Sequence, residues 1–524
     1  MENKKPLLSI RNLKQYFPIR GKRGLFVKAN DGVSLEIYEN ETLGVVGESG
    51  CGKSTLGRTL LQLYNQTDGE TIYYGRDIDD MVPRYVLDIY HNLEKRVRTA
   101  KALVAKAEAV EAEYQELKAA HKLKVANEDD SVASGYSKEY YAKRNERNEI
   151  KRQANLEYLA MVRLVGGFYA VDPKEYPTIT KALEAHYYAS RELNKVNRAI
   201  TKLTAKLNDA DYTVEKKGTN PAGRDALKRK LDNLTGPETT RCKEAKEKTQ
   251  VAIDTIRAKF ADDPEFQKYE AMRDNGIDLA RLTYNEMRYI RRDLQLIFQD
   301  PYSSLNPRLT VGQIISEGPI THHNFLSNNE RMQDYTMEVM ENCGLASYMI
   351  HRYPHQFSGG QRQRIGIARA LSVDPRFVVC DEAVSALDVS IQSQIINLLQ
   401  TLKEKNNLTY MFISHDLSVV KYISDRIAVM YLGNIVELAT SEQLFANPLH
   451  PYTEALLSAI PTTDDPATRQ EMILLEGDIP SPVRPPAGCK FNTRCRDCME
   501  VCKHVVPEWR EHAPGHFVAC HKYD

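Results

Sequence analysis

The chain has 524 residues, more than one small domain needs, and its 42% hydrophobic and 27% charged residues exclude a wholly disordered or fibrous protein. The 71 basic and 71 acidic side chains cancel, which argues against a nucleic-acid partner. No apolar run reaches the roughly 18 residues of a membrane span, and the start lacks a signal-peptide core, so we expect a cytosolic protein. Because thiols stay reduced in the cytosol and the nine Cys are an odd number, we expect no disulfide framework.

Residues 1–80 and 276–446 have the composition of one α/β unit. Short apolar runs such as TLGVVG, LQLIFQ, RFVVCDE and LTYMFISHD alternate with helix-like stretches and turns. Residues 81–275 differ, because Lys, Arg, Glu and Ala dominate long segments with helical periodicity. We therefore predict that 81–275 is an inserted helical domain and that the Pro- and Cys-rich residues 447–524 form a separate tail.

The inserted segment is expected to be a helical hairpin or small bundle. Leu93, Val97 and Ala100 step by three and four residues, and Val196 and Ile200 belong to a second such stripe. Each stripe requires a partner helix. Turn-forming stretches such as NEDDSVASG and KKGTNPAGRD separate the segments, which disfavours one continuous rod.

A phosphate-binding loop is predicted directly after the apolar run TLGVV. The segment from Gly47 to Thr55 fits G-x-x-x-x-G-K-[ST] and precedes a helix-like run. The glycines allow backbone N–H groups to converge on an anion, Lys53 reaches the outer phosphates, and the Ser54 hydroxyl can bind Mg²⁺. A Gly-rich turn that only packs a helix on a strand would leave Lys-Ser-Thr unexplained. The expected ligand is a nucleoside triphosphate.

Two carboxylates at the end of another apolar strand supply the remaining chemistry. Asp381 is expected to hold the Mg²⁺ shell, and Glu382 to orient the attacking water. His415, at the end of MFISHD, is placed to contact the terminal phosphate, although a buried structural histidine is the alternative. Without the loop, the Asp-Glu pair would equally fit a solvated strand end.

A second anion site is predicted at Phe357-Ser-Gly-Gly-Gln361. The hydroxyl and backbone amides of Ser358, Gly359, Gly360 and Gln361 lie at the start of a helix-like run. One chain cannot easily wrap both sites around one nucleotide, whereas two chains arranged head to tail can hold ATP between them. We therefore expect ATP-driven dimerisation.

The set GESGCGKST, LIFQDP, FSGGQ, VVCDE, SALD and SHD, in this order, resembles the nucleotide-binding domain of ABC transporters. Finer matches, including DPYSSLNPR, YLGNIVE and NPLHPYTEALL, resemble ATPase subunits of oligopeptide and dipeptide importers, particularly the F-type subunit. The resemblance implies a RecA-like core, an antiparallel β subdomain and a helical subdomain. It also implies an ATPase that pairs with a paralogous ATPase subunit beneath two transmembrane permease subunits, served indirectly by an extracellular peptide-binding protein, at the cytoplasmic face of the membrane.

The resemblance also assigns residues. Gln299 would link Mg²⁺ and water to the transmembrane partner, the loop from Ser385 to Asp388 would contact the opposite subunit, and Phe17 or the adjacent Tyr16 would stack on adenine. The catalytic set is then Glu382, His415 and Gln299. The full set of expected nucleotide contacts is Phe17, Gly47, Ser49, Gly50, Cys51, Gly52, Lys53, Ser54, Thr55, Gln299, Asp381, Ser358, Gly359, Gly360, Gln361 and Asp388, with Ser54, Gln299 and Asp381 on Mg²⁺.

Two departures from the family pattern stand out. Ala383 replaces the usual Pro, which we expect to alter only loop stiffness. The insertion is the larger departure, and an accessory bundle and a docking platform both fit it. A chromosome-maintenance ATPase with a coiled-coil arm is the rival reading, but such arms enter after the glutamine loop, while this segment precedes Gln299. A regulatory or translation-type soluble ABC protein normally joins two cassettes, and only one phosphate loop is present.

Five of the nine cysteines gather in the last 36 residues. Clustered Cys in a reducing compartment indicates metal. The family resemblance suggests a [4Fe-4S] cluster on Cys489, Cys495, Cys502 and Cys520. Zinc, using Cys498 and one of His504, His512 or His516, and free thiols are the alternatives.

Overall fold

The computed structural model describes residues 5–127, 138–218, 223–325, 327, 329–385, 387–460 and 472–523. An eight-stranded sheet at its centre has the order β11-β12-β10-β9-β3-β8-β7-β6. Its parallel part contains β9 (Arg426–Tyr431), β3 (Thr42–Val46), β8 (Thr409–Ile413), β7 (Phe377–Asp381) and β6 (Leu294–Ile297). Every residue of β3, β7 and β8 is buried, as expected for parallel strands covered on both faces. The carboxyl ends of β3, β6, β7 and β8 therefore meet at one edge.

The C-terminal residues extend this sheet on its other side. The three strands there are β10 (Asn434–Thr440), β11 (Arg510–Ala513) and β12 (His516–Val518). β12 pairs antiparallel with β10, with Glu437 opposite Val518, and β11 pairs with β12. Residues 510–518 thus share the hydrogen-bonded ladder of the cassette and are not detached from it.

A second sheet is antiparallel and has the order β2-β1-β4-β5. It consists of β1 (Pro6–Pro18), β2 (Phe26–Tyr38), β4 (Asp68–Tyr73) and β5 (Ile277–Asp278). β4 and β5 are neighbours in space although some 200 residues separate them in the chain, since Tyr73 pairs with Ile277. The long helical segment therefore leaves the sheet and returns to it at the same place.

The helices of the cassette cover the two faces of the central sheet. They are α1 (Lys53–Leu60), α10 (Tyr284–Ile290), α11 (Val311–Thr321), α12 (Glu330–Asn342), α13 (Gly359–Leu371), α14 (Val389–Asn406), α15 (Leu417–Ile423), α16 (Ser441–Ala446), α17 (Pro451–Ser458) and α18 (Glu500–His504). One core contains buried residues of α11 to α14 together with Val378 and Phe412, and the other contains α1 and α10 with Val379 and Met411. Adjacent residues of β7 and β8 thus face opposite cores, which is the period of a strand.

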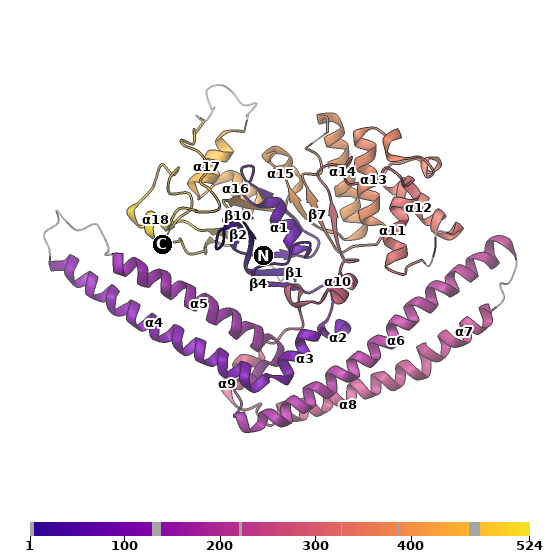
Figure 1. Cartoon of the computed structure of the whole chain (residues 1–524), viewed down its shortest axis with the longest axis horizontal. Coiled ribbons are helices and arrows are strands. Elements are labelled where there is room, and N and C mark those ends of the chain that lie inside the picture. Colours follow the sequence, from indigo (N-terminus) through magenta and orange to yellow (C-terminus); the bar gives the residue numbers. More distant parts are fainter. Residues whose placement is uncertain are drawn as a thin grey trace.

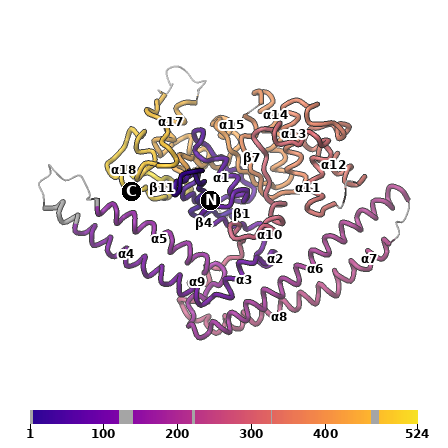
Figure 2. The backbone as a smooth tube through the Cα atoms, in the orientation of Figure 1, coloured from indigo at the N-terminus to yellow at the C-terminus, as the bar shows by residue number. Residues whose placement is uncertain are grey.

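Between β4 and β5 the described chain is helical. The helices are α2 (Ile78–Met81), α3 (Arg84–His91), α4 (Leu93–Asn127), α5 (Lys138–Val165), α6 (Tyr176–Lys217), α7 (Arg224–Asn233), α8 (Thr239–Ala258) and α9 (Pro264–Glu270). α4 packs along α5, and α6 packs along α7 and α8. Figures 1 and 2 show these as two helical arms that diverge in a V beneath the cassette. Leu93, Val97 and Ala100 are buried, whereas Val196 and Ile200 are only partly buried.

The arms meet in their own apolar core and touch both ends of the cassette. That core contains Val97, Val162, Phe168, Ile179 and Phe266, among others. The α4–α5 arm reaches the C-terminal residues, where the Arg147 guanidinium pairs with Glu508 at 3.1 Å and Asn145 donates to the carbonyl of His504 at 3.1 Å. The other arm reaches α12, where the Arg331 guanidinium lies 2.7 Å from Asp209 and the Tyr212 hydroxyl donates to Asp334 at 2.6 Å.

Candidate active site

The predicted phosphate loop joins β3 to α1. Gly47 and Gly52 have φ values of 149° and 102°, which favour glycine. A Cβ on Gly47 would lie 2.1 Å from the carbonyl oxygen of Met430, and one on Gly52 would lie 2.2 Å from that of Ala29. Because both obstacles are backbone atoms, only glycine fits, and the loop is held in its turn from both sides.

Lys53 lies across the opening of this loop. Its Nζ donates to the carbonyl oxygens of Gly47 at 2.7 Å and Glu48 at 3.0 Å, and the residue is only 5% exposed. The first N–H groups of α1, which starts at Lys53, have no intrahelical acceptor. An ammonium group and free N–H groups therefore converge where a phosphate would bind. Of the remaining predicted loop contacts, Cys51 is buried and Ser49 is exposed.

Asp381 ends β7 and is completely buried. Its Oδ2 accepts a hydrogen bond from Arg58 Nη2 at 3.1 Å, whereas its Oδ1 has no partner among the described residues. A buried carboxylate oxygen without a donor is costly unless a cation or water satisfies it. This atom therefore fits the expected Mg²⁺ shell. Arg58, one turn after Lys53 on α1, was not foreseen, because nothing in its local sequence distinguishes it.

The three catalytic candidates meet at the carboxyl ends of β6, β7 and β8. Gln299 Nε2 donates to Glu382 Oε2 at 2.6 Å, and His415 Nδ1 lies 3.7 Å from Glu382 Oε1. Glu382 has φ 48°, which turns its side chain out of the strand direction, and its N–H donates to the Ile413 carbonyl at 3.0 Å. The imidazole of His415 is more than half exposed, so it is not a buried structural histidine.

The predicted second anion site lies at the start of α13. Ser358 Oγ accepts the N–H of Gln361 at 3.3 Å, and Gln361 Oε1 accepts the N–H of Ser358 at 3.1 Å, which is a complete capping box. A Cβ on Gly360 would lie 2.6 Å from Ile391, so the turn packs against α14. Within the described residues, no hydrogen bond or ion pair joins this turn to the loop of residues 47–55.

The remaining predicted contacts lie around this edge. Phe17 is half-buried, with its ring 5.2 Å from that of Tyr64. The alternative aromatic, Tyr16, donates its hydroxyl to Asp31, and burial together with this bond raises the pKa of Tyr16. Asp388 is exposed at the start of α14.

Comparison with known proteins identifies this arrangement. A model of the family "ABC transporter" matches residues 30–164 and 265–385, and a model described as "Oligopeptide/dipeptide transporter, C-terminal region" matches residues 436–502. The oligopeptide transport ATP-binding protein AppF of Bacillus subtilis is 52% identical over 250 residues, which cover 47% of this chain and 75% of AppF. The chain belongs to the ABC transporter ATP-binding family.

Other relatives of this ABC protein have similar names. The oligopeptide transport ATP-binding protein OppF of Salmonella typhimurium is 52% identical over 250 residues, covering 48% of this chain and 74% of OppF. A putative peptide import ATP-binding protein of Brucella ovis is 54% identical over 246 residues, covering 47% of this chain and 77% of that protein. A solved dimer of the ATP-binding cassette MJ0796 covers 83% of this chain and 98% of its own, with a TM-score of 0.41 and 15% identity.

The C-terminal residues of this ABC protein hold its phosphate loop. The Arg494 guanidinium binds both carboxylate oxygens of Glu48, at 2.7 and 3.1 Å, and the N–H of Glu48 donates to the Tyr452 hydroxyl at 2.9 Å. Nearby, Lys490 Nζ lies 3.0 Å from Asp31. Sequence reasoning missed these contacts, because more than 400 residues separate Glu48 from Arg494 and no local pattern marks the pair.

The metal site expected in the cysteine tail stays a prediction. In the part of the chain that the structure describes, which includes all five tail cysteines, no group of three or more Cys, His, Asp or Glu is placed to hold a metal ion. Burial raises the pKa of Cys489 to about 12 and that of Cys495 to about 11. The thiol of Cys489 also interacts electrostatically with those of Cys495, Cys502 and Cys520, the other three expected ligands. The cluster on these four residues and the zinc alternative are not tested further by the structure.

Proposed function

We propose that this chain is the ATP-hydrolysing subunit that powers import of oligopeptides or dipeptides across the cytoplasmic membrane. The observation that carries the proposal is the joining of an ABC cassette to a C-terminal region that matches the oligopeptide/dipeptide transporter family. The relatives above are named as peptide transport or import ATP-binding proteins, which supports the same substrate class.

The site suggests a division of work among its residues. Lys53 and the N–H groups at the start of α1 bind the β- and γ-phosphates, and Phe17 supports the adenine. Asp381 and Ser54 would hold Mg²⁺, with Gln299 completing its shell, and Arg58 fixes the Asp381 carboxylate through its other oxygen. The metal supplies neutralisation of the charge that develops on the phosphates.

Glu382 would orient and polarise the attacking water. Its two carboxylate oxygens face Gln299 and His415, so the side chain is held from both sides. Phosphoryl transfer depends mainly on such positioning and on electrostatic stabilisation. His415 would then contact the γ-phosphate, and Gln299 would report the state of the site to the membrane partner.

A second ATPase chain completes the site in this proposal. Among the described residues, the turn from Ser358 to Gln361 makes no hydrogen bond with the loop of its own chain, and in this proposal it covers the nucleotide of another chain. We infer a heterodimer with a paralogous ATPase, with the loop ending at Asp388 at the contact. ATP then favours the closed dimer because only this state offers both sets of phosphate contacts, and hydrolysis removes the preference.

The dimer is proposed to dock peripherally on two permease subunits at the cytoplasmic face, with an extracellular peptide-binding protein delivering substrate and no nucleic acid involved. None of the described helices is long and apolar enough to cross a bilayer. In this proposal, the segment 81–275 is an accessory helical domain between cassette parts 1–80 and 276–446, with 447–524 as the C-terminal region. The chromosome-maintenance alternative gains nothing from the comparisons, which return transport proteins.

Glu382→Gln tests the catalytic assignment. The variant keeps the shape of the side chain but lacks the carboxylate, so we expect ATP binding within about threefold of the parent, a stable ATP-bound dimer, and hydrolysis reduced by roughly 10²–10⁴-fold. Glu404→Gln, exposed on α14, is the matched control and should leave hydrolysis unchanged. Full hydrolysis by Glu382→Gln would remove this residue from catalysis. Recovery of integral membrane subunits with the tagged chain tests the transporter assignment separately.

The metal content of the tail is tested by anaerobic purification followed by an absorption spectrum and iron and zinc assays. A cluster on Cys489, Cys495, Cys502 and Cys520 predicts a visible absorption band and stoichiometric iron, whereas the zinc alternative predicts a colourless protein with stoichiometric zinc. A colourless protein without iron or zinc would leave only the free-thiol alternative.

A further inference from the structure

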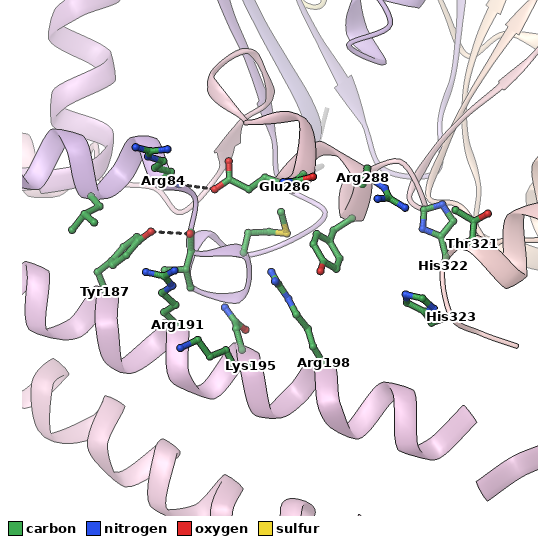
Figure 3. A pocket seen from close by; sticks show the side chains of 16 residues that line it. Arg84, Tyr187, Arg191, Lys195, Arg198, Glu286, Arg288, Thr321, His322 and His323 are labelled. Atoms are coloured by element: carbon green, nitrogen blue, oxygen red, sulfur yellow. Dashed lines mark hydrogen bonds between the residues drawn. The ribbon is translucent and has the colours of Figure 1, made fainter. Parts of the chain in front are cut away.

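A pocket of about 770 Å³ lies where the helical insertion meets the cassette, away from the loop of residues 47–55. Four segments line it: the turn between α2 and α3, the middle of α6, α10, and the end of α11. Figure 3 shows Arg191, Lys195 and Arg198 on α6, with Glu286, Arg288 and His322 on the cassette side of the pocket. The volume falls within the range of pockets for small molecules, about 300–1,000 Å³.

The pocket carries a strong excess of positive charge. Its lining includes five Lys and Arg residues, Arg84, Arg191, Lys195, Arg198 and Arg288, against the single carboxylate of Glu286. That carboxylate already accepts hydrogen bonds from the backbone N–H groups of Arg84 at 2.7 Å and Thr283 at 2.8 Å. Its oxygens therefore cap the starts of two helices and are not paired with the guanidinium groups.

The guanidinium groups are left without anionic partners. Among the residues that the structure describes, no carboxylate lies within ion-pair distance of Arg191, Arg198 or Arg288, whereas Lys195 pairs with Glu192 at 2.6 Å. The nearby carboxylate of Asp79 does not line the pocket and is held by His186 at 3.0 Å and Lys246 at 2.9 Å. The three guanidinium groups without carboxylate partners repel one another, which is the arrangement of an anion site rather than of a structural ion-pair network.

The walls are fixed before any ligand binds. The Arg198 guanidinium lies 4.1 Å from the ring centre of Tyr289, which links α6 to α10. The Tyr187 hydroxyl donates to the Val82 carbonyl at 3.2 Å, and Asn194 Nδ2 donates to the Asp79 carbonyl at 3.0 Å, so α6 is tied to the α2–α3 turn as well. Preorganised walls reduce the entropic cost of binding.

A second cavity of about 420 Å³ shares Arg198, Tyr289 and His322 with the first. It adds Lys202 and Arg292 to the lining, together with the carboxylate of Asp80. Together the cavities form a basic groove, which we call the insertion pocket, with room for more than one phosphate group. Arginine forks bind phosphate oxygens in pairs, so this lining suits phosphate better than a single carboxylate.

We propose that the insertion pocket binds a small anion carrying two or more phosphate groups, at a site separate from the ATP of the phosphate loop. The lining residues come from the insertion and from the cassette, so a ligand here would contact both. This proposal does not depend on the transported substrate.

Isothermal titration of the full chain with inorganic tripolyphosphate tests it. In Lys53→Ala, where the phosphate loop is weakened, we expect binding to persist and to weaken as salt rises from 0.05 to 0.3 M, because the contacts are electrostatic. In the same background, Arg191→Gln with Arg198→Gln should raise the Kd at least tenfold. The matched control is Lys181→Gln with Lys206→Gln, two exposed cations of α6 outside the pocket lining, which should change the Kd less than twofold.

Two further arms identify the source of the phosphates. In the first arm, Lys53→Ala is titrated with ATP. Tighter binding of ATP than of tripolyphosphate, together with loss of ATP binding when Arg191→Gln and Arg198→Gln are added, would identify the ligand as a nucleotide whose base contacts Tyr289. Vesicles of anionic phospholipid that bind in place of tripolyphosphate would overturn the small-anion proposal. Equal tripolyphosphate binding with and without the two arginines, or none in Lys53→Ala, would also overturn it. Should circular dichroism show that the double variant is unfolded, Arg288→Gln, on α10, provides the same test.

Discussion

Arg494→Ala tests whether the C-terminal region positions the phosphate loop. The Arg494 side chain is 7% exposed and binds Glu48 of the loop through two hydrogen bonds at 2.7 and 3.1 Å. Its guanidinium also lies over the ring of Tyr431, 5.9 Å from the ring centre. The hydrogen bond to Glu48 is the main reason that the pKa of Arg494 is raised. Removing the side chain leaves Glu48 without its partner.

The size of the effect follows from this geometry. Breaking a fully buried ion pair costs about 3–5 kcal/mol. Glu48 is 23% exposed and regains water, so we expect about 2–3 kcal/mol here. If half of this cost falls on the nucleotide-ready conformation of the loop, ATP affinity drops about tenfold, since 1.4 kcal/mol corresponds to one decade. The ATP affinity of Arg494→Lys should lie between those of the parent and Arg494→Ala, because Lys cannot bind both Glu48 oxygens with one planar group.

The measurement is an ATP titration by calorimetry with a thermal melt of the same samples. Arg496→Ala is the control, because its more exposed side chain pairs with Glu454 in the same region without touching the loop, and its ATP Kd should stay within twofold. A double-mutant cycle with Glu48→Gln isolates the pair. A lower melting temperature with unchanged ATP affinity would refute the argument, since Arg494 would then only anchor the C-terminal region.

Three further predictions concern the loop, the catalytic edge and a buried carboxyl. Gly52→Ala should weaken ATP binding more than a hundredfold, because its Cβ would lie 2.2 Å from a backbone oxygen. Gly50→Ala, with φ 80° and open space around it, should weaken ATP binding only about tenfold, since the strain of about 1–2 kcal/mol corresponds to roughly one decade. Equal losses of ATP affinity would contradict the steric reason. Gln299→Ala should lower kcat roughly 10–100-fold and change ATP affinity less than threefold, because it removes the 2.6 Å hydrogen bond to Glu382. Steady-state kinetics and an ATP titration measure the two quantities. An unchanged kcat would show that the assignment of Gln299 is incorrect. Burial and the Asp278 carboxylate raise the pKa of Glu70 from 4.5 to about 7. Between these two pH values the folded state keeps a proton that the unfolded chain releases. The free energy of unfolding therefore falls as pH rises from 4.5 through 7. Glu70→Gln should flatten this slope and stabilise the protein at pH 8 by about 1–3 kcal/mol, and parallel pH profiles of the two melting curves would exclude the mechanism.

The sequence alone determined the local chemistry. The loop glycines, Lys53 and the Asp-Glu pair could be assigned because each depends on neighbours a few residues away: a positive φ, a helix start, the end of a buried strand. The alternation of short apolar runs with helix-like stretches also indicated an α/β unit. Helical periodicity predicted the helices between β4 and β5, because burial of one stripe is a local pattern.

Only the tertiary structure decided which distant groups meet. Arg58 beside Asp381, and Arg494 beside Glu48, depend on packing that no local pattern encodes. The insertion pocket arises because α6 crosses α10, which brings together cations that look like ordinary solvated residues in the sequence. The tail cysteines add a further case, because the fold brings Cys489 close enough to Cys495, Cys502 and Cys520 for their thiols to interact electrostatically. The sequence determines which side-chain groups are present, but a functional site forms only where the fold places such groups within a few ångströms of one another.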